Sequence, residues 1–287
     1  MNRTRLTVAE LLALKGTRQL SMLHLENLDE ARAAAAARID LLSIETPIWS
    51  AAMREAAGDC FVFVGLQYGQ LATFDDYVRA AHDAILLGGD AVYCAASLEI
   101  VSRLRAEGIP VCGHTGLIPS RRTWTGGFKA VGRTAESAAF VYRQVKELEH
   151  AGAFAAEIEV VPARVTAEIA KRTSMLLLSM GGGTGGHAQY LFSVDVLGCT
   201  PGHQPRHAKV YRDFRAELDR LQQERIAAFS EYAADVDSGR YPEEQHLVGG
   251  LAPHVEHLTE RQPGDPPGDE LRVPAADAPA TQHPDPD

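Results

Sequence analysis

The chain has 287 residues, of which 45% are hydrophobic, and its formal net charge is -10 at pH 7. A chain of this length and apolar content can bury a large core, either in one barrel or in two small domains. Because no Lys/Arg cluster interrupts the acidic composition, we expect neither a nucleic acid nor an anionic membrane as a partner.

The four cysteines, Cys60, Cys94, Cys112 and Cys199, lie far apart and form no C-x-x-C motif. This spacing argues against a zinc site or a redox pair and favours a reducing compartment. The first residues show no signal-peptide pattern, and no run approaches the roughly 18 apolar residues of a membrane-spanning helix. We therefore predict a cytoplasmic protein that does not enter a membrane.

Short runs rich in Val, Ile and Leu alternate with amphipathic stretches between residues 19 and 198. This alternation is typical of parallel βαβ units. The predicted strands are 19–25, 39–45, 60–66, 90–95, 109–114, 154–160, 175–180 and 190–197. The predicted helices between them include 27–38, 74–87, 98–107, 135–151 and 163–172. Eight such units predict an α/β fold, a (β/α)8 TIM barrel.

Residues 208–234 carry apolar side chains at helical spacing among many charges. They predict an extra C-terminal helix that either caps the barrel or packs against another subunit. From about Leu251 the chain is rich in Pro, Asp, Gly and Ala, a composition that cannot bury enough apolar surface to offset its chain entropy. We predict one barrel domain over residues 1–250 and a disordered tail over residues 251–287.

The active site of a (β/α)8 barrel forms at the C-terminal ends of its strands, so polar residues there are the first candidates. Strand alternation puts Glu157 and Glu159 on one face, and we expect that face to point into the barrel. A buried carboxylate serves either catalysis or a structural ion pair, and both interpretations stay open. His114 is a second inward candidate, although a lone histidine is more often structural.

Other candidates at the predicted strand ends are His24, Glu26, Glu45, Thr46, Tyr93 and Asp195. The run GGGTGG, from Gly181 to Gly186, offers backbone N–H groups for a carboxylate or a phosphate but lacks the spacing of a P-loop. A plain tight loop is the alternative. Arg121 and Arg122 could clamp an anionic substrate or belong to a solvated loop.

The segment IPVCGHTGLIPSRRTWTGGFKAVGR, residues 109–133, resembles a segment of the ketopantoate hydroxymethyltransferase family. The similarity continues through EHAGAF at 149–154, EIEVVPARVTAEIAKR at 157–172 and SGRYPEEQHL at 238–247. It covers most of residues 90–248 and, faintly, residues 7–46. The resemblance implies a barrel of the phosphoenolpyruvate mutase and isocitrate lyase superfamily that assembles as a homo-oligomer.

The resemblance also implies an aldol-type reaction. Mg²⁺ chelates a 2-oxo acid such as 3-methyl-2-oxobutanoate, a base removes the neighbouring proton, and the enolate attacks a one-carbon unit from methylenetetrahydrofolate. Glu159 matches the family's catalytic glutamate, and His114 matches a second family position. Glu45 and Thr46 stand where the family has an Asp-Ser pair, which makes Glu45 the predicted metal ligand. Substrate contacts are predicted at Thr46, Tyr93, Gly181 and Gly182.

Three positions depart from the family pattern: Gly65, Tyr93 and Ala95 stand where the family has Asp, Lys and Glu. One remaining carboxylate would hold Mg²⁺ weakly, because this ion prefers octahedral oxygen coordination. Tyr93 and His114 could then stabilise the oxyanion without a metal. The sequence leaves open a divergent hydroxymethyltransferase, an enzyme of specialised biosynthesis with another substrate, and an inactive barrel that regulates or scaffolds a partner.

Overall fold

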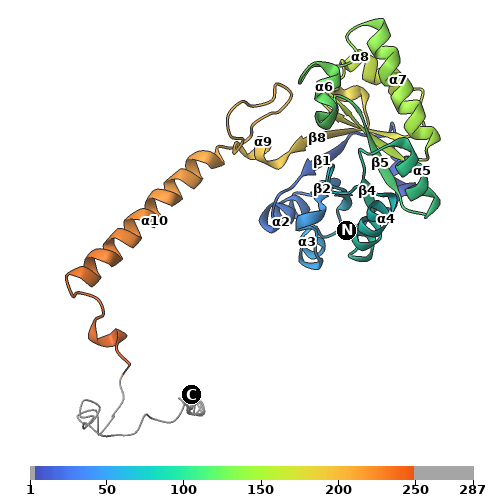
Figure 1. Cartoon of the computed structure of the whole chain (residues 1–287). Coiled ribbons are helices and arrows are strands. Elements are labelled where there is room, and N and C mark those ends of the chain that lie inside the picture. Colours follow the sequence, from blue (N-terminus) through green and yellow to red (C-terminus); the bar gives the residue numbers. More distant parts are fainter. Residues whose placement is uncertain (1–3, 249–287) are drawn as a thin grey trace. The chain divides into compact units, whose positions relative to one another are not determined.

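The computed structural model describes residues 4–248 of the chain. Its eight strands pair in chain order, each parallel to its neighbours, and β1 pairs with β8 to close a barrel (Figure 1). The strands are β1 Leu20–His24, β2 Leu41–Glu45, β3 Phe61–Gly65, β4 Ala91–Tyr93, β5 Val111–Gly116, β6 Ala155–Glu159, β7 Leu176–Met180 and β8 Ala188–Phe192. The predicted (β/α)8 TIM barrel is confirmed.

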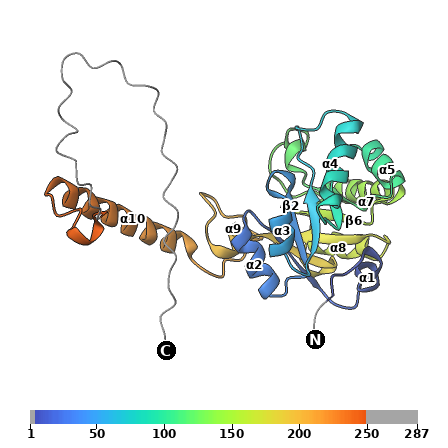
Figure 2. The same ribbon diagram turned by 90° about the horizontal axis from the view of Figure 1, so that it is seen from below.

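Helices lie in the connections between strands, before the first strand and after the last one, and those in the connections surround the strands in Figures 1 and 2. They are α1 Val8–Ala13, α2 Leu28–Ala36, α3 Ala51–Ala56, α4 Phe74–Leu86, α5 Leu98–Ala106, α6 Arg122–Thr125, α7 Ala135–His150, α8 Ala163–Ala170, α9 Ser193–Leu197 and α10 Phe214–Asp237. Short 3₁₀ helices are η1 Thr46–Ile48, η2 Pro119–Arg121, η3 Gly183–Gly185 and η4 Glu244–His246. The five predicted connecting helices correspond to α2, α4, α5, α7 and α8.

The end of the eighth strand differs from the prediction, because β8 stops at Phe192 and residues 193–197 form α9. The sequence SVDVL fits either a strand or a helical turn. Gly198 adopts φ 75°, and the N–H of Cys199 donates to the carbonyl of Val194, a glycine-terminated helix end. Asp195, predicted in strand eight, therefore lies on a helix.

The predicted helix over residues 208–234 begins later than expected, since α10 spans Phe214–Asp237. The preceding residues instead run beside α9, where the N–H of Tyr211 donates to the carbonyl of Val196 at 2.9 Å. The chain divides into two compact units, Met1–Gln223 and Glu224–Asp287. The domain assignment over residues 1–250 stays a prediction, and the predicted tail lies outside the described residues.

Alternate residues of every strand fill the barrel interior, as the pleat of a strand requires. The lower layers are apolar: Leu20, Met22, Leu41, Phe61, Phe63, Ala155, Leu176 and Leu178 belong to one buried cluster. Leu11 of α1 joins this cluster and is fully buried. Toward the C-terminal ends of the strands buried polar side chains such as Glu157 and Glu159 lie beside Met180 of this cluster, so the site lies on top of an apolar floor.

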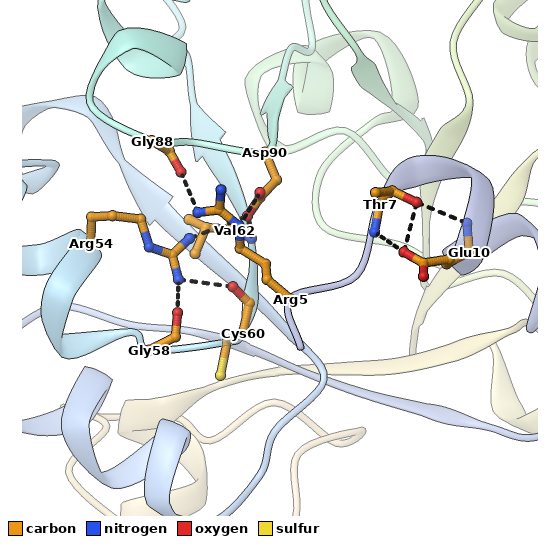
Figure 3. Close-up of polar contacts among 9 residues, drawn as sticks. All are labelled: Arg5, Thr7, Glu10, Arg54, Gly58, Cys60, Val62, Gly88 and Asp90. Atoms are coloured by element: carbon orange, nitrogen blue, oxygen red, sulfur yellow. Dashed lines mark hydrogen bonds and ion pairs between the residues drawn. The ribbon is translucent and has the colours of Figure 1, made fainter. Parts of the chain in front are cut away.

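The opposite end of the barrel is tied together by two arginines and one carboxylate, drawn in Figure 3. Asp90 precedes β4 and lies 3.2 Å from Arg5 Nε and 3.2 Å from Arg54 Nη1, and it accepts the N–H of Val62 at 2.8 Å. Arg54 also donates to the carbonyl of Cys60 at 3.0 Å. These bonds join the N-terminal segment and α3 to the starts of β3 and β4, far from the polar strand ends.

None of the helices within residues 4–248 is long and apolar enough to cross a membrane.

Candidate active site

A cavity of about 690 Å³ lies at the C-terminal ends of the strands. Its floor includes Met180 and Tyr190, and its polar wall includes Glu45, Tyr93, His114, Glu157 and Glu159. The barrel register explains this grouping, because His114 on β5 pairs with Glu157 and Gly116 pairs with Glu159 on β6. The predicted strand-end residues Glu45, Tyr93, His114 and Glu159 are thus brought to one cavity.

Four of these side chains form a hydrogen-bonded chain. His114 Nε2 lies 3.1 Å from Glu159 Oε2, and His114 Nδ1 lies 2.6 Å from the Tyr93 hydroxyl. The same hydroxyl lies 2.6 Å from Glu157 Oε2. All of these contacts are within hydrogen-bond range. The two predicted catalytic residues therefore touch each other, and Glu157 joins them through Tyr93.

Burial and neighbouring charges shift the pKa values of these hydrogen-bonded side chains. Burial alone would lower the pKa of His114, but the Glu157 charge and the hydrogen bond to Glu159 outweigh it, so the pKa is raised. Burial also raises the pKa of Glu157, with a further contribution from the Glu159 charge. The pKa of Tyr93 lies well above its usual range, mainly because of burial and then because of Glu157. Tyr93 is therefore protonated at neutral pH.

Glu45 reaches over its neighbour strand. Glu45 pairs with Gly65 in the register of β2 and β3, and a Cβ atom built at Gly65 would lie 2.6 Å from Glu45 Oε1. Only glycine at position 65 leaves room for this carboxylate. Burial raises the pKa of Glu45. The longer side chain at position 45 and the missing side chain at position 65 thus compensate each other sterically.

The donor set at these strand ends is a poor fit for Mg²⁺. Glu45 is the single carboxylate among the three positions 45, 65 and 95 at which the resemblance implies metal ligands. Within residues 4–248, His114, Glu157 and Glu159 are the group whose ligand atoms lie close enough for a cation, all within 4.8 Å of one another. This group includes a nitrogen, which Mg²⁺ does not favour. Its members are already hydrogen-bonded to each other, directly or through Tyr93.

The segment after α9 contributes residues that the sequence patterns did not single out. His203, Arg206 and His207 line the cavity, and Arg206 is the only Lys or Arg within residues 4–248 that does so. No strand-end rule selects them, because they belong to an irregular segment. The one available signal was the local density of cationic residues in GHQPRHAK. Asp195, which was a candidate, also lines the cavity and accepts a hydrogen bond from Thr200.

Three predicted substrate contacts are not among the residues that line this cavity: Thr46, Gly181 and Gly182. Thr46 begins η1. A Cβ atom at Gly182 would lie 2.8 Å from the hydroxyls of Ser179 and Thr166, so this glycine packs against side chains. Their role in substrate binding stays a prediction.

Sequence comparison connects this cavity to known enzymes. A family model described as ketopantoate hydroxymethyltransferase matches residues 45–244. The 3-methyl-2-oxobutanoate hydroxymethyltransferase of Thermus thermophilus is 37% identical over 199 residues, which are 68% of this chain and 74% of the relative. The enzyme of the same name from Thermotoga neapolitana is 28% identical over 266 residues, covering 84% of this chain and 96% of the relative.

A comparison of folds agrees with the barrel. A crystal structure of a proposed phosphonomutase from Burkholderia cenocepacia J2315 superimposes with a TM-score of 0.51 at 12% identity, covering 79% of this chain and 100% of that one. At this identity the likeness concerns the fold alone. The family match begins at Glu45, the last residue of β2, and spans the strands that carry His114 and Glu159. The chain therefore belongs to the ketopantoate hydroxymethyltransferase family, a family of transferase enzymes.

Proposed function

We propose that the chain performs enolate chemistry on a 2-oxo acid, and that its reaction is hydroxymethyl transfer to 3-methyl-2-oxobutanoate from methylenetetrahydrofolate. The observation that carries this proposal is the 3.1 Å contact between Glu159 and His114 at the wall of the strand-end cavity. A carboxylate held beside an imidazole can remove a proton next to a ketone and keep it within the site. The names of the relatives supply the substrate class.

The step begins when Glu159 takes the C3 proton of the oxo acid. The C3–H electron pair becomes the C2–C3 double bond of the enolate, and negative charge develops on the oxo oxygen. The wall opposite that oxygen needs hydrogen-bond donors or positive charge to lower the barrier. Among the described residues, His114 contacts the base, with Nε2 3.1 Å from Glu159 Oε2, and its ring can supply an N–H donor. C3 of the enolate then forms a bond to the methylene carbon of methylenetetrahydrofolate, and the bond from that carbon to one folate nitrogen breaks with its electron pair left on the nitrogen. Water then displaces the second folate nitrogen, takes a proton back to that nitrogen, and leaves the hydroxymethyl group on C3 and tetrahydrofolate as the other product.

Arg206 is proposed to anchor the substrate carboxylate, because among the described residues it is the only Lys or Arg that lines the cavity. Charge-assisted bonds of this kind contribute about 1.5–3 kcal/mol. Arg206→Gln should therefore raise KM for the oxo acid by about 10- to 100-fold and leave kcat nearly unchanged. Lys209→Gln is the matched control, since Lys209 lies three residues further on and does not line the cavity. An equal KM in both variants would contradict this assignment.

Proton exchange tests the proposed function most directly. The protein, freed of metal by a chelator, is incubated with 3-methyl-2-oxobutanoate in D2O, and proton NMR follows the C3 signal with and without added Mg²⁺. We expect the signal to disappear in both conditions, because Glu45 by itself is a poor Mg²⁺ site. No exchange in either condition would reject the proposed function. Exchange only with added Mg²⁺ would keep enolate chemistry but reject the expectation that it proceeds without a metal.

A further inference from the structure

Glu157 takes no part in the step described above, yet it is one of the most buried carboxylates of the barrel. Its side chain is 5% exposed, against 6% for His114 and 12% for Glu159. A buried carboxylate without a partner is costly, so its neighbours must compensate it. The Tyr93 hydroxyl at 2.6 Å is the single hydrogen-bond partner found for it among the described residues, and His114 Nδ1 lies 4.0 Å away.

The number of protons shared by the hydrogen-bonded side chains limits how they can donate and accept. The Tyr93 hydroxyl carries one proton and has two partners at 2.6 Å. In the first arrangement Tyr93 donates to ionised Glu157, and His114 donates from Nδ1 to Tyr93 and from Nε2 to Glu159. In the second, Tyr93 donates to a neutral His114, and Glu157 must itself be protonated. Both arrangements carry the same net charge and differ by one proton moved along Tyr93.

Charge favours the first arrangement. An imidazolium between two carboxylates gains attraction from both sides, and its charge acts against the burial that raises the pKa of Glu157. The other titratable groups that line the cavity are Glu45 on β2, Tyr68 between β3 and α4, Tyr190 on β8, His24 on β1, Asp195 on α9, and His203, Arg206 and His207 after α9. Of these, the Asp195 carboxylate favours a cation, the Arg206 charge opposes one, and burial raises the pKa of Glu45, which weakens its contribution.

We propose that Tyr93 and Glu157 are positioning residues that hold His114 doubly protonated beside Glu159. This inference rests on the proposed function for its chemical meaning, since the imidazolium would face the charge of the enolate. A fixed positive charge at that place lowers the energy of the enolate electrostatically. Tyr93 links the two groups as a neutral hydroxyl, because its raised pKa keeps its proton in place.

Nitrogen-15 NMR of the histidine side chains tests the inference without any substrate. In the full-length protein at pH 7, His114 should carry protons on both nitrogens, with its resonances assigned through His114→Gln. His187 serves as an internal reference, because burial lowers its pKa to about 4 and its Nδ1 accepts the Leu177 N–H at 2.8 Å. It should therefore appear as a neutral ring with the proton on Nε2 and report that each variant is folded.

The decisive comparison uses two variants and a matched control. In Tyr93→Phe and Glu157→Gln, the titration midpoint of His114 should move to lower pH, and Glu157→Asp should partly restore it. Proton exchange at pH 7 should fall by about 100-fold in the first two, the order of loss when a catalytic group is misplaced by about 1 Å. Tyr77→Phe is the control, since Tyr77 is a buried tyrosine of α4 outside the cavity.

Two results would overturn the inference. One is a neutral His114 at pH 7 in the unmodified protein, or a His114 midpoint that neither variant moves while the His187 signals stay native. The other is a shift of the His114 nitrogens to a metal-bound position at stoichiometric Zn²⁺. A doubly protonated His114 in a protein without proton exchange would reject the proposed function and leave the hydrogen-bonding inference intact.

Discussion

Replacing Glu159 with glutamine is expected to slow exchange of the C3 proton of 3-methyl-2-oxobutanoate by about 10²- to 10⁴-fold, the usual contribution of a positioned general base. The amide keeps the size of the side chain but cannot accept the proton. Its oxygen can still accept a hydrogen bond from His114 Nε2, whose present distance to Glu159 Oε2 is 3.1 Å. The cavity should therefore keep its shape while the rate of exchange falls.

Glu168→Gln is the matched control for this variant. Glu168 lies on α8, the helix that follows β6, and pairs at the surface with Lys171 and Arg172. Its replacement should leave exchange unchanged. Exchange is measured by proton NMR in D2O, and the free energy of unfolding by urea titration confirms that both variants are folded. A Glu159→Gln protein with undiminished exchange would remove Glu159 from the role of base.

Gly116→Ala is expected to lower the free energy of unfolding by about 3 kcal/mol, through a strained backbone and an overpacked contact together. Gly116 ends β5 with φ 80°, and a Cβ atom there would lie 2.4 Å from the backbone oxygen of Glu159. That oxygen cannot move freely, because it accepts the N–H of Leu117 at 2.9 Å. The measurement is urea unfolding followed by circular dichroism.

Gly108→Ala separates the cost of the strained backbone from the cost of the overpacked contact. Gly108 has the same φ of 80°, but a Cβ atom built there meets nothing within 4 Å. Its replacement should cost only about 1 kcal/mol, the backbone contribution alone. Similar losses in the two variants would show that β5 and β6 can separate at Gly116. The close approach of the two strands that places Glu159 beside His114 would then need another explanation.

The barrel could be predicted because its strands are buried on both faces and read as continuous apolar runs. Runs such as FVFVG in β3 and LLLSM in β7 show this clearly. The end of β8 could not be predicted, because SVDVL suits a strand or a helical turn equally well and Gly198 decides between them. The short helix α3 was missed for a similar reason, since six residues carry little periodicity.

For the candidate site, the sequence could predict which strand ends carry polar residues. Alternation along β6 placed Glu157 and Glu159 on one inward face, and both are buried. The sequence could not show that Glu157 meets Tyr93, because 64 residues separate them and their contact depends on the barrel register. Nor could it show that Glu45 lies over Gly65, which follows from the pairing of β2 with β3.

The sequence by itself determined the barrel, the inward direction of the β6 carboxylates and, by resemblance, the family, while the roles of Glu159 and His114 stay predictions. Only the tertiary structure decided that Tyr93 links His114 to Glu157 and that Arg206 reaches the cavity. The physical reason is the separation along the sequence of the residues that interact. Alternation and strand length are local properties of the chain, whereas the meeting of side chains from β4, β5, β6 and the segment after α9 depends on how the barrel closes.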